Sequence, residues 1–242
     1  MLLIHWRTDT DEFEEGQWLK GRIYERRCDL SPDGSLLVYF AATHKKPFGT
    51  WTAISKPPFL TALALWPKGD AWGGGGLFES KDSLLLNHWP NQFELAPDFK
   101  VPGWLRISPL GRHTGWGEDE PIWSMRLLRD GWTRGDGWER RNPRNPDLLL
   151  RMLILRIAER GEPWYVIEHE LVDTTSGAVQ SLGRSDWADW DRSGDLLFAK
   201  EGKIFRLPHG NEPRQIADLS EMTFEPREPA ASAKTWPEPL TK

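Results

Sequence analysis

The sequence predicts an all-β protein, a small β-propeller of about five blades with four antiparallel strands in each. Two features of the composition indicate β-structure. The 22 glycines and 19 prolines divide the 242-residue chain into short segments, and the 15 tryptophans supply broad rings that fill the space between packed sheets. A third observation, the recurrence of one turn-and-strand design, indicates repeated sheets. Long helices are not expected.

The recurring design is a polar turn with Asp, Ser or Gly, followed by an apolar run that is too short for a helix. It occurs at Cys28 to Ala42, Glu79 to Asn87 and Trp187 to Leu207. The leucines that open the three apolar runs, Leu36, Leu84 and Leu196, are 48 and 112 positions apart, and 112 is twice 56. A repeat of roughly 40 to 50 residues is typical of propeller blades, so the chain has room for about five.

Hairpins are predicted at two places, because apolar runs flank a glycine turn. One passes through Glu201 and Gly202, and the other follows Trp164 to Asp173. The segment Leu148 to Ala158 has two interpretations. Asp147 would cap a helix there, whereas the alternation along the segment favours a strand that leads into the second hairpin.

One motif carries a family resemblance. The run LSPDGSLLVYFA, residues 30–41, resembles the repeat of the TolB-type, WD-like β-propellers, in which a Ser-Pro-Asp-Gly turn precedes an inner apolar strand. The run WADWDRSGDLLFA, residues 187–199, is similar to a second, degenerate copy. The resemblance implies a propeller fold and hardly any function, since members of that architecture bind many different things.

The composition and net charge favour a cytoplasmic protein that binds neither nucleic acid nor membrane. The formal charge of −5 gives no basic excess to neutralise phosphates. Cys28 is the only cysteine, which excludes an internal disulfide and suits a reducing compartment. We find no basic leader and no apolar run of roughly 20 residues. Residues 1–224 are expected to form one domain, and the Pro-rich residues 225–242 a tail that is laid on the surface or disordered.

Four consecutive glycines, Gly73 to Gly76, raise the question of a phosphate-binding loop. Such a loop needs a Lys and a Ser or Thr directly after the glycines, at the start of a helix. Here Gly76 leads into Leu77, Phe78 and Glu79, and no βαβ unit surrounds the run. We therefore expect a close passage of backbone near the propeller axis, where side chains do not fit.

No cofactor or metal is expected. Asp189, Asp191 and Ser193 resemble the opening of a calcium loop, but Lys200 stands where the bidentate glutamate belongs, so a self-bonded turn is favoured. The histidines show no zinc spacing. On a strand, Glu168 and Glu170 face away from His169, so the three cannot converge.

The stretch from Trp104 to Arg144 mixes tryptophan with arginine, the residue types most enriched at binding hot spots. The alternative is that these rings pack between blades. Trp132 and Trp138 lie in the glycine-rich run GWTRGDGW, and of these tryptophans they are the two that we expect to be exposed. The predicted partner-binding residues are Trp116, Trp123, Arg129, Trp132, Arg134, Trp138 and Arg140.

These observations favour a non-enzymatic scaffold that binds a protein partner through this loop face. One alternative is a carbohydrate-binding propeller, because small five-bladed lectins of the tachylectin type resemble the chain in size and tryptophan content, although equal repeated sites are not visible. A less favoured alternative is a hydrolase whose carboxylates lie at the propeller axis. Its candidate carboxylates are Asp29, Asp33, Asp186 and Asp189.

Overall fold

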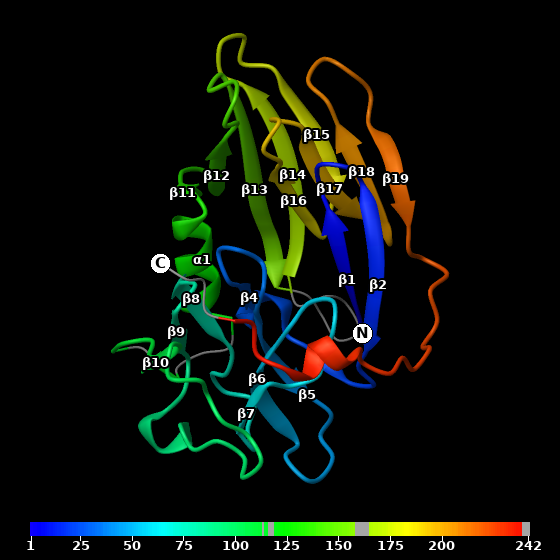
Figure 1. Cartoon of the computed structure of the whole chain (residues 1–242). Helices are drawn as coiled ribbons and strands as arrows, with labels where there is room; N and C mark the ends of the chain where they lie inside the picture. The colour runs from blue at the N-terminus through cyan, green and yellow to red at the C-terminus, as the bar shows by residue number, and fades with distance from the viewer. Residues whose placement is uncertain (113, 116–118, 158–164, 239–242) are drawn as a thin grey trace. The chain divides into compact units, whose positions relative to one another are not determined.

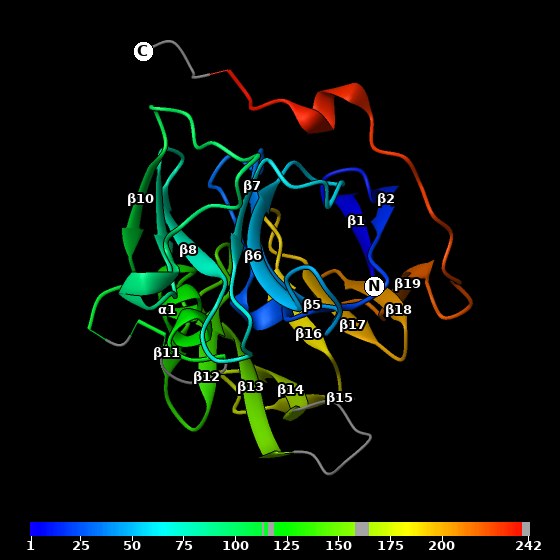
Figure 2. The same cartoon turned by 90° about the horizontal axis from the view of Figure 1, so that it is seen from below.

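The computed structural model describes residues 1–112, 114–115, 119–157 and 165–238. The chain divides into two compact units, one formed by Met1–Arg126 with Phe224–Lys242 and the other by Leu127–Thr223. Strands make up most of the regular structure (Figures 1 and 2), which confirms the predicted β-structure in several antiparallel sheets. No closed sheet is present among the described residues. The prediction of one domain over residues 1–224 stays a prediction.

The first unit contains three sheets, with two, five and three strands. A hairpin pairs β1 (Leu2–Arg7) with β2 (Glu12–Trp18). The five-stranded sheet is formed by β3 (Arg22–Ile23), β4 (Asp29–Leu30), β5 (Leu37–Ala42), β6 (Thr50–Ser55) and β7 (Ala64–Pro67). The third sheet is formed by β8 (Gly76–Ser80), β9 (Ser83–Leu86) and β10 (Arg106–Pro109). Short 3₁₀ turns cover Glu25–Arg27, Pro90–Gln92 and Ala231–Lys234.

The core of the first unit lies on both faces of β5, whose six residues are all buried. Because side chains alternate along a strand, Val38 packs with one apolar cluster, together with Trp66 and Phe78, while Tyr39 packs with another. Figure 2 shows β5, β6 and β7 side by side. The apolar run after the Ser31 to Gly34 turn is therefore a central strand, as the sequence predicts.

One strand of this unit departs from the expected antiparallel pattern. β10 pairs with β9 in parallel, from Arg106 opposite Ser83 to Pro109 opposite Leu86. Parallel neighbours need a long crossover, and residues 87–105 supply it. The strand numbers also differ from four in all three sheets of this unit.

The second unit contains two antiparallel sheets (Figure 1). The first joins β11 (Thr133–Arg134), β12 (Trp138–Arg141), β13 (Leu148–Ile157), β14 (Tyr165–Asp173) and β15 (Val179–Arg184) in sequence order. The second joins β16 (Trp187–Trp190), β17 (Leu196–Lys200), β18 (Lys203–Leu207) and β19 (Arg214–Asp218). Both predicted hairpins are confirmed, β14 with β15 and β17 with β18.

The ambiguous segment is a strand from Leu148 to Ile157, and Ala158 lies outside the described residues. β13 pairs with β12 on one side and β14 on the other, so its backbone bonds are made across the sheet and the helical alternative is wrong. A short α-helix that the sequence analysis did not predict, α1 (Ile122–Arg129), begins directly after Pro121, a residue suited to the first turn. No helix in the described part of the chain is long and apolar enough to cross a membrane.

Residues 225–238 lie against the first unit. The indole Nε1 of Trp236 donates to the carbonyl oxygen of Lys100 at 3.2 Å, and its ring meets Trp104 edge to face at 6.1 Å. Ala233 is buried. The described part of this segment therefore contacts the first unit, and its status as a separate tail stays a prediction.

Candidate functional site

The predicted tryptophans that the structure describes, Trp123, Trp132 and Trp138, are all buried. Trp116 lies outside the described residues. Trp123 belongs to the first unit, where it is buried in α1 beneath the guanidinium of Arg26, 4.8 Å from the ring centre. The other five residues belong to the second unit. Partner binding by these residues stays a prediction.

The expectation that Trp132 and Trp138 are exposed is wrong. Their exposed fractions are only 4% and 2%. Trp138 opens β12 opposite Met152 of β13, so its ring enters the interior of the unit, and the guanidinium of Arg134 covers it at 3.7 Å. Glycine-rich flanks predicted exposure, but a strand register placed the ring inside.

Two of the three predicted arginines already pair with carboxylates. Arg129 is exposed and donates from Nε to Asp130 at 2.8 Å. Arg140 is half-buried and forms an ion pair with Asp189. Arg134 is exposed but stacks on Trp138. All three side chains therefore contact neighbouring residues of the same unit.

The glycine run is a close passage of backbone, as the sequence predicts. Gly73, Gly74 and Gly75 all have positive φ, between 64° and 86°. A Cβ atom on Gly74 would lie 2.3 Å from the ring of Phe40, and one on Gly75 would lie 2.0 Å from the carbonyl oxygen of Arg27. Side chains do not fit here, which explains the four consecutive glycines.

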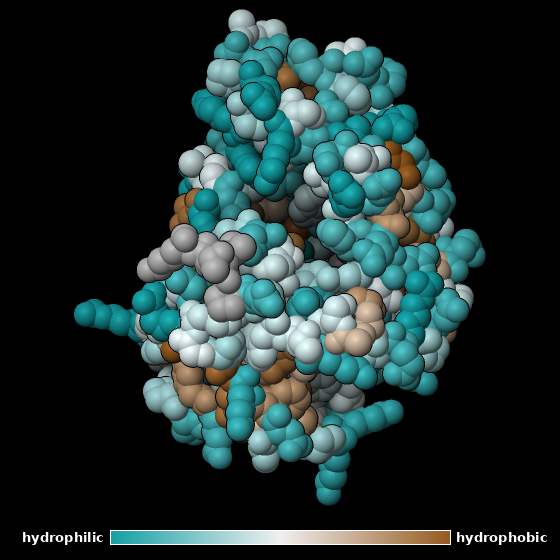
Figure 3. Space-filling model, in the orientation of Figure 1, coloured by the Kyte–Doolittle hydropathy of each residue, from teal (hydrophilic) through white to brown (hydrophobic). Residues whose placement is uncertain are grey.

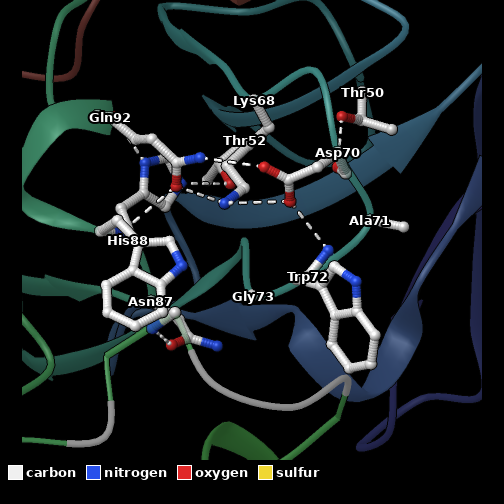
Figure 4. A network of polar contacts seen from close by, with 12 residues as sticks. Thr50, Thr52, Lys68, Asp70, Ala71, Trp72, Gly73, Asn87, His88 and Gln92 are labelled. Carbon is white, nitrogen blue, oxygen red and sulfur yellow. Dashed lines mark hydrogen bonds and ion pairs between the residues drawn. The ribbon is translucent and has the colours of Figure 1, made fainter.

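This close passage brings together two loops that are separate in the sequence (Figure 4). One loop, residues 68–73, ends at the first of the glycines, and the other, residues 87–92, follows β9. Arg27 pins the first loop, because its Nη1 donates to the carbonyl oxygens of Ala71 and Gly73 at 2.7 Å each. Thr50 adds a bond from Oγ1 to the carbonyl oxygen of Asp70 at 2.6 Å.

A polar network joins the two loops. Gln92 accepts from Nζ of Lys68 through Oε1, and its Nε2 donates to Oδ2 of Asp70 at 3.0 Å. The ammonium of Lys68 lies 3.5 Å from Oδ1 of Asp70. Burial lowers the pKa of Lys68, and the charge of Asp70 opposes that change. We call Lys68, Asp70 and Gln92, together with His88 and Thr52 described next, the loop network.

His88 forms the inner end of the loop network. Its Nδ1 lies 2.8 Å from the carbonyl oxygen of Gln92, and a carbonyl can only accept, so Nδ1 carries the proton. Nε2 then accepts from Oγ1 of Thr52 at 2.8 Å. Burial lowers the pKa of His88 to about 4, so the ring is neutral at pH 7.

The Thr52 to His88 contact has the geometry of a nucleophile and its base, but both residues are 0% exposed. His169 makes a similar buried contact with Oγ of Ser185, at 2.7 Å. A substrate cannot reach either hydroxyl in this structure. These pairs satisfy buried polar atoms and hold neighbouring segments together.

The carboxylates weighed for hydrolysis also have structural partners or exposed positions. Asp29 accepts from the backbone N of Phe78 at 2.8 Å. Asp33 accepts bonds from Ser31 and Ser35 within its own turn.

The calcium-like run is a self-bonded turn, as favoured, because Asp191 accepts from Ser193 Oγ at 2.7 Å and also pairs with Arg206.

Two large aromatic side chains of these loops reach the surface. Trp72 is 61% exposed and Trp89 is 40% exposed. The backbone N of Trp72 donates to Oδ1 of Asp70 at 2.9 Å, and Figure 4 shows its indole pointing away from the loop network. The Trp89 indole packs against Gly115, where a side chain would overlap it. The loop network thus fixes the backbone that carries two exposed indoles.

Sequence reasoning missed this site. The polar residues lie at Lys68 to Asp70 and at Asn87 to Gln92, on either side of the β8–β9 hairpin, and no motif links them. The available signal was the glycine run itself. Backbone that passes this close to its neighbours must bring its flanking loops together.

No protein-family model matches the chain, and no curated protein matches it. A search of solved structures finds a likeness to the crystal structure of the tricorn protease, at 10% sequence identity and a TM-score of 0.28. The match covers 91% of this chain and 19% of the tricorn protease chain. At this TM-score the likeness assigns neither a fold nor an activity. The resemblance to TolB-type propellers stays a prediction.

Proposed function

We propose that the chain is a non-enzymatic binding module that holds a protein partner. The observation that carries the proposal is the pair of exposed indoles, Trp72 and Trp89, on loops fixed by the loop network. Tryptophan is the residue type most enriched at binding hot spots, because it combines a large apolar area with a polar N–H group. The two buried hydroxyl and histidine pairs favour binding over catalysis.

The fixed loops lower the entropy cost of binding, since the backbone is ordered before a partner arrives. Asp70, whose side chain is 41% exposed, adds a carboxylate beside Trp72. On the face drawn in Figure 3, hydrophilic residues predominate and apolar residues form separate patches. A partner that uses an anchoring ring with a polar surround suits the exposed Trp72 indole beside the Asp70 carboxylate.

The test is affinity capture from cells that express the chain, with partners identified by mass spectrometry. The double variant Trp72→Ala, Trp89→Ala should lose a protein that the unmodified chain retains. Trp187→Ala is the matched control, because Trp187 is also exposed but belongs to the second unit. Equal retention by all three proteins would overturn the proposed surface.

Carbohydrate binding is a second candidate, favoured by the residues that neighbour Trp72. An indole beside the carboxylate of Asp70, with the amide of Gln92 bonded to that carboxylate, combines a face for stacking with planar hydrogen-bonding groups. Binding on a glycan array that disappears in Trp72→Ala would support it. An array without signal at millimolar glycan would dismiss it.

For the architecture, we propose that the five sheets are the blades of a TolB-like, WD-like propeller. The proposal is supported by the number of sheets and by the confirmed hairpins. A single closed ring of 242 residues should have a radius of gyration of about 18 Å, the value for a compact chain of this length. Small-angle X-ray scattering measures it, and a clearly larger radius would contradict a closed ring.

A further inference from the structure

The second unit contains a pocket of about 370 Å³. It lies between its two sheets, since β13, β14 and β15 contribute lining residues from one sheet and β16, β17 and β18 from the other. The volume is near the lower end of the range for small-molecule sites, roughly 300 to 1,000 Å³. None of its residues belongs to the loop network of the first unit.

The floor of the pocket is apolar. Trp190, Leu196 and Leu207 are neighbours across the β16–β18 strands and all are buried. Leu148 and Leu171 line it from the other sheet. The indole Nε1 of Trp190 already donates to the carbonyl oxygen of Arg140 at 3.1 Å, so the ring meets a ligand as an apolar surface held in one orientation.

The rim of the pocket carries two carboxylates, Asp173 and Glu212. Its lining contains no lysine or arginine, and His209 is its one other ionisable side chain. Asp173 is held by its own turn, because Oδ1 accepts from the backbone N atoms of Thr175 at 2.8 Å and Ser176 at 3.0 Å. These backbone hydrogen bonds lower the pKa of Asp173, so it is ionised at pH 7. Glu212 is exposed at the opposite turn, after Pro208.

We propose that this pocket binds a small molecule with an apolar, ring-sized body and a protonated amino group. The body lies against Trp190 and the leucines of the floor, and the ammonium group pairs with Asp173 and Glu212 at the rim. An anionic ligand of the same shape is repelled by both carboxylates. The site is independent of the binding surface proposed for the first unit.

The experiment is a titration of the ¹⁵N-labelled full chain, followed by amide chemical shifts. The probe is 2-phenylethylamine, and 3-phenylpropionate is a comparison of similar size with the opposite charge. The amides of Ala178, Val179, Gly194 and Gly210, all of lining residues, report on the site. We expect saturable shifts at these positions with the amine and none with the carboxylate at the same concentration.

Variants separate charge from shape. Asp173→Asn keeps an oxygen acceptor for its turn but removes the charge. Combined with Glu212→Gln, it should lower the affinity for the amine by about fivefold, the effect expected for the loss of two exposed ion pairs. Glu221→Gln, an exposed carboxylate that is not part of the lining, should leave the affinity unchanged. Val179→Trp adds a large side chain at the exposed edge of the pocket and should also weaken binding.

The proposal is overturned if the amine produces no saturable shift at concentrations up to about 10 mM, which is the order of dissociation constant expected for a fragment-sized ligand. It is also overturned if the carboxylate binds as well as the amine, or if the double charge variant binds like the Glu221→Gln control. Because the two probes are compared on the unmodified chain, the result does not depend on whether every variant folds.

Discussion

Replacing Gly75 with alanine tests the reason for the glycine run. The added Cβ lies 2.0 Å from the carbonyl oxygen of Arg27, so the two backbones must separate. Separation strains the two bonds from Arg27 Nη1 to the first loop, worth about 1 kcal/mol each. The φ of +76° adds about 1 kcal/mol for a residue with a side chain. We therefore expect a loss of about 3 kcal/mol in the free energy of unfolding.

Gly69→Ala is the matched control. Gly69 has a φ of +79°, but no atom lies within 4 Å of the position that the alanine methyl group would take, so only the conformational cost of about 1 kcal/mol applies. Urea unfolding followed by tryptophan fluorescence gives both values, and the expected difference of about 2 kcal/mol moves the midpoint by about 1 M. If the two variants lose the same free energy of unfolding, close packing does not explain the glycine run.

Three other predictions follow from burial. The free energy of unfolding should fall as the pH is lowered from about 6.5 to 4, because the unfolded chain binds a proton at His88 that the folded chain excludes. At pH 5 the contribution of His88 to this loss is about 2 kcal/mol, and His169, whose pKa burial also lowers to about 4, adds a loss of about the same size. His88→Gln should therefore remove about half of the decrease in the free energy of unfolding between pH 7 and pH 5 in urea titrations. Trp138→Ala should lower the free energy of unfolding by about 3 to 5 kcal/mol, and Trp72→Ala should lower it by less than about 0.5 kcal/mol. Similar losses for the two variants would contradict their different burial. Burial raises the pKa of the Cys28 thiol to about 12, so Ellman's reagent should label it only after urea unfolding, and prompt labelling of the native chain would refute this.

The strands and turns were predictable because their signals are local. The runs after Ser31 and Asp195 have the length and composition of strands, and they form β5 and β17. The close passage at Gly73 to Gly76 was predictable by elimination, since residues that a phosphate loop requires are missing. In each case, the decisive chemistry lies within about a dozen neighbouring residues.

What the sequence did not reveal depends on contacts between distant residues. Trp132 and Trp138 were expected on the surface because glycines surround them, but pairing of β12 with β13 sets the direction of the Trp138 ring. The loop network joins Thr52 to His88 across 36 positions. Neither composition nor spacing records which strand register brings such residues together.

The return of residues 224–238 to the first unit has a consequence for the order of folding during synthesis. Residues 127–223 form a continuous stretch, so the second unit can be complete as soon as it leaves the ribosome. The first unit begins earlier but receives Trp236, which covers Trp104, only after residues 127–223 have been synthesised. Until then the Trp104 ring lacks that cover, and a nascent chain stalled after residue 223 would present it to chaperones.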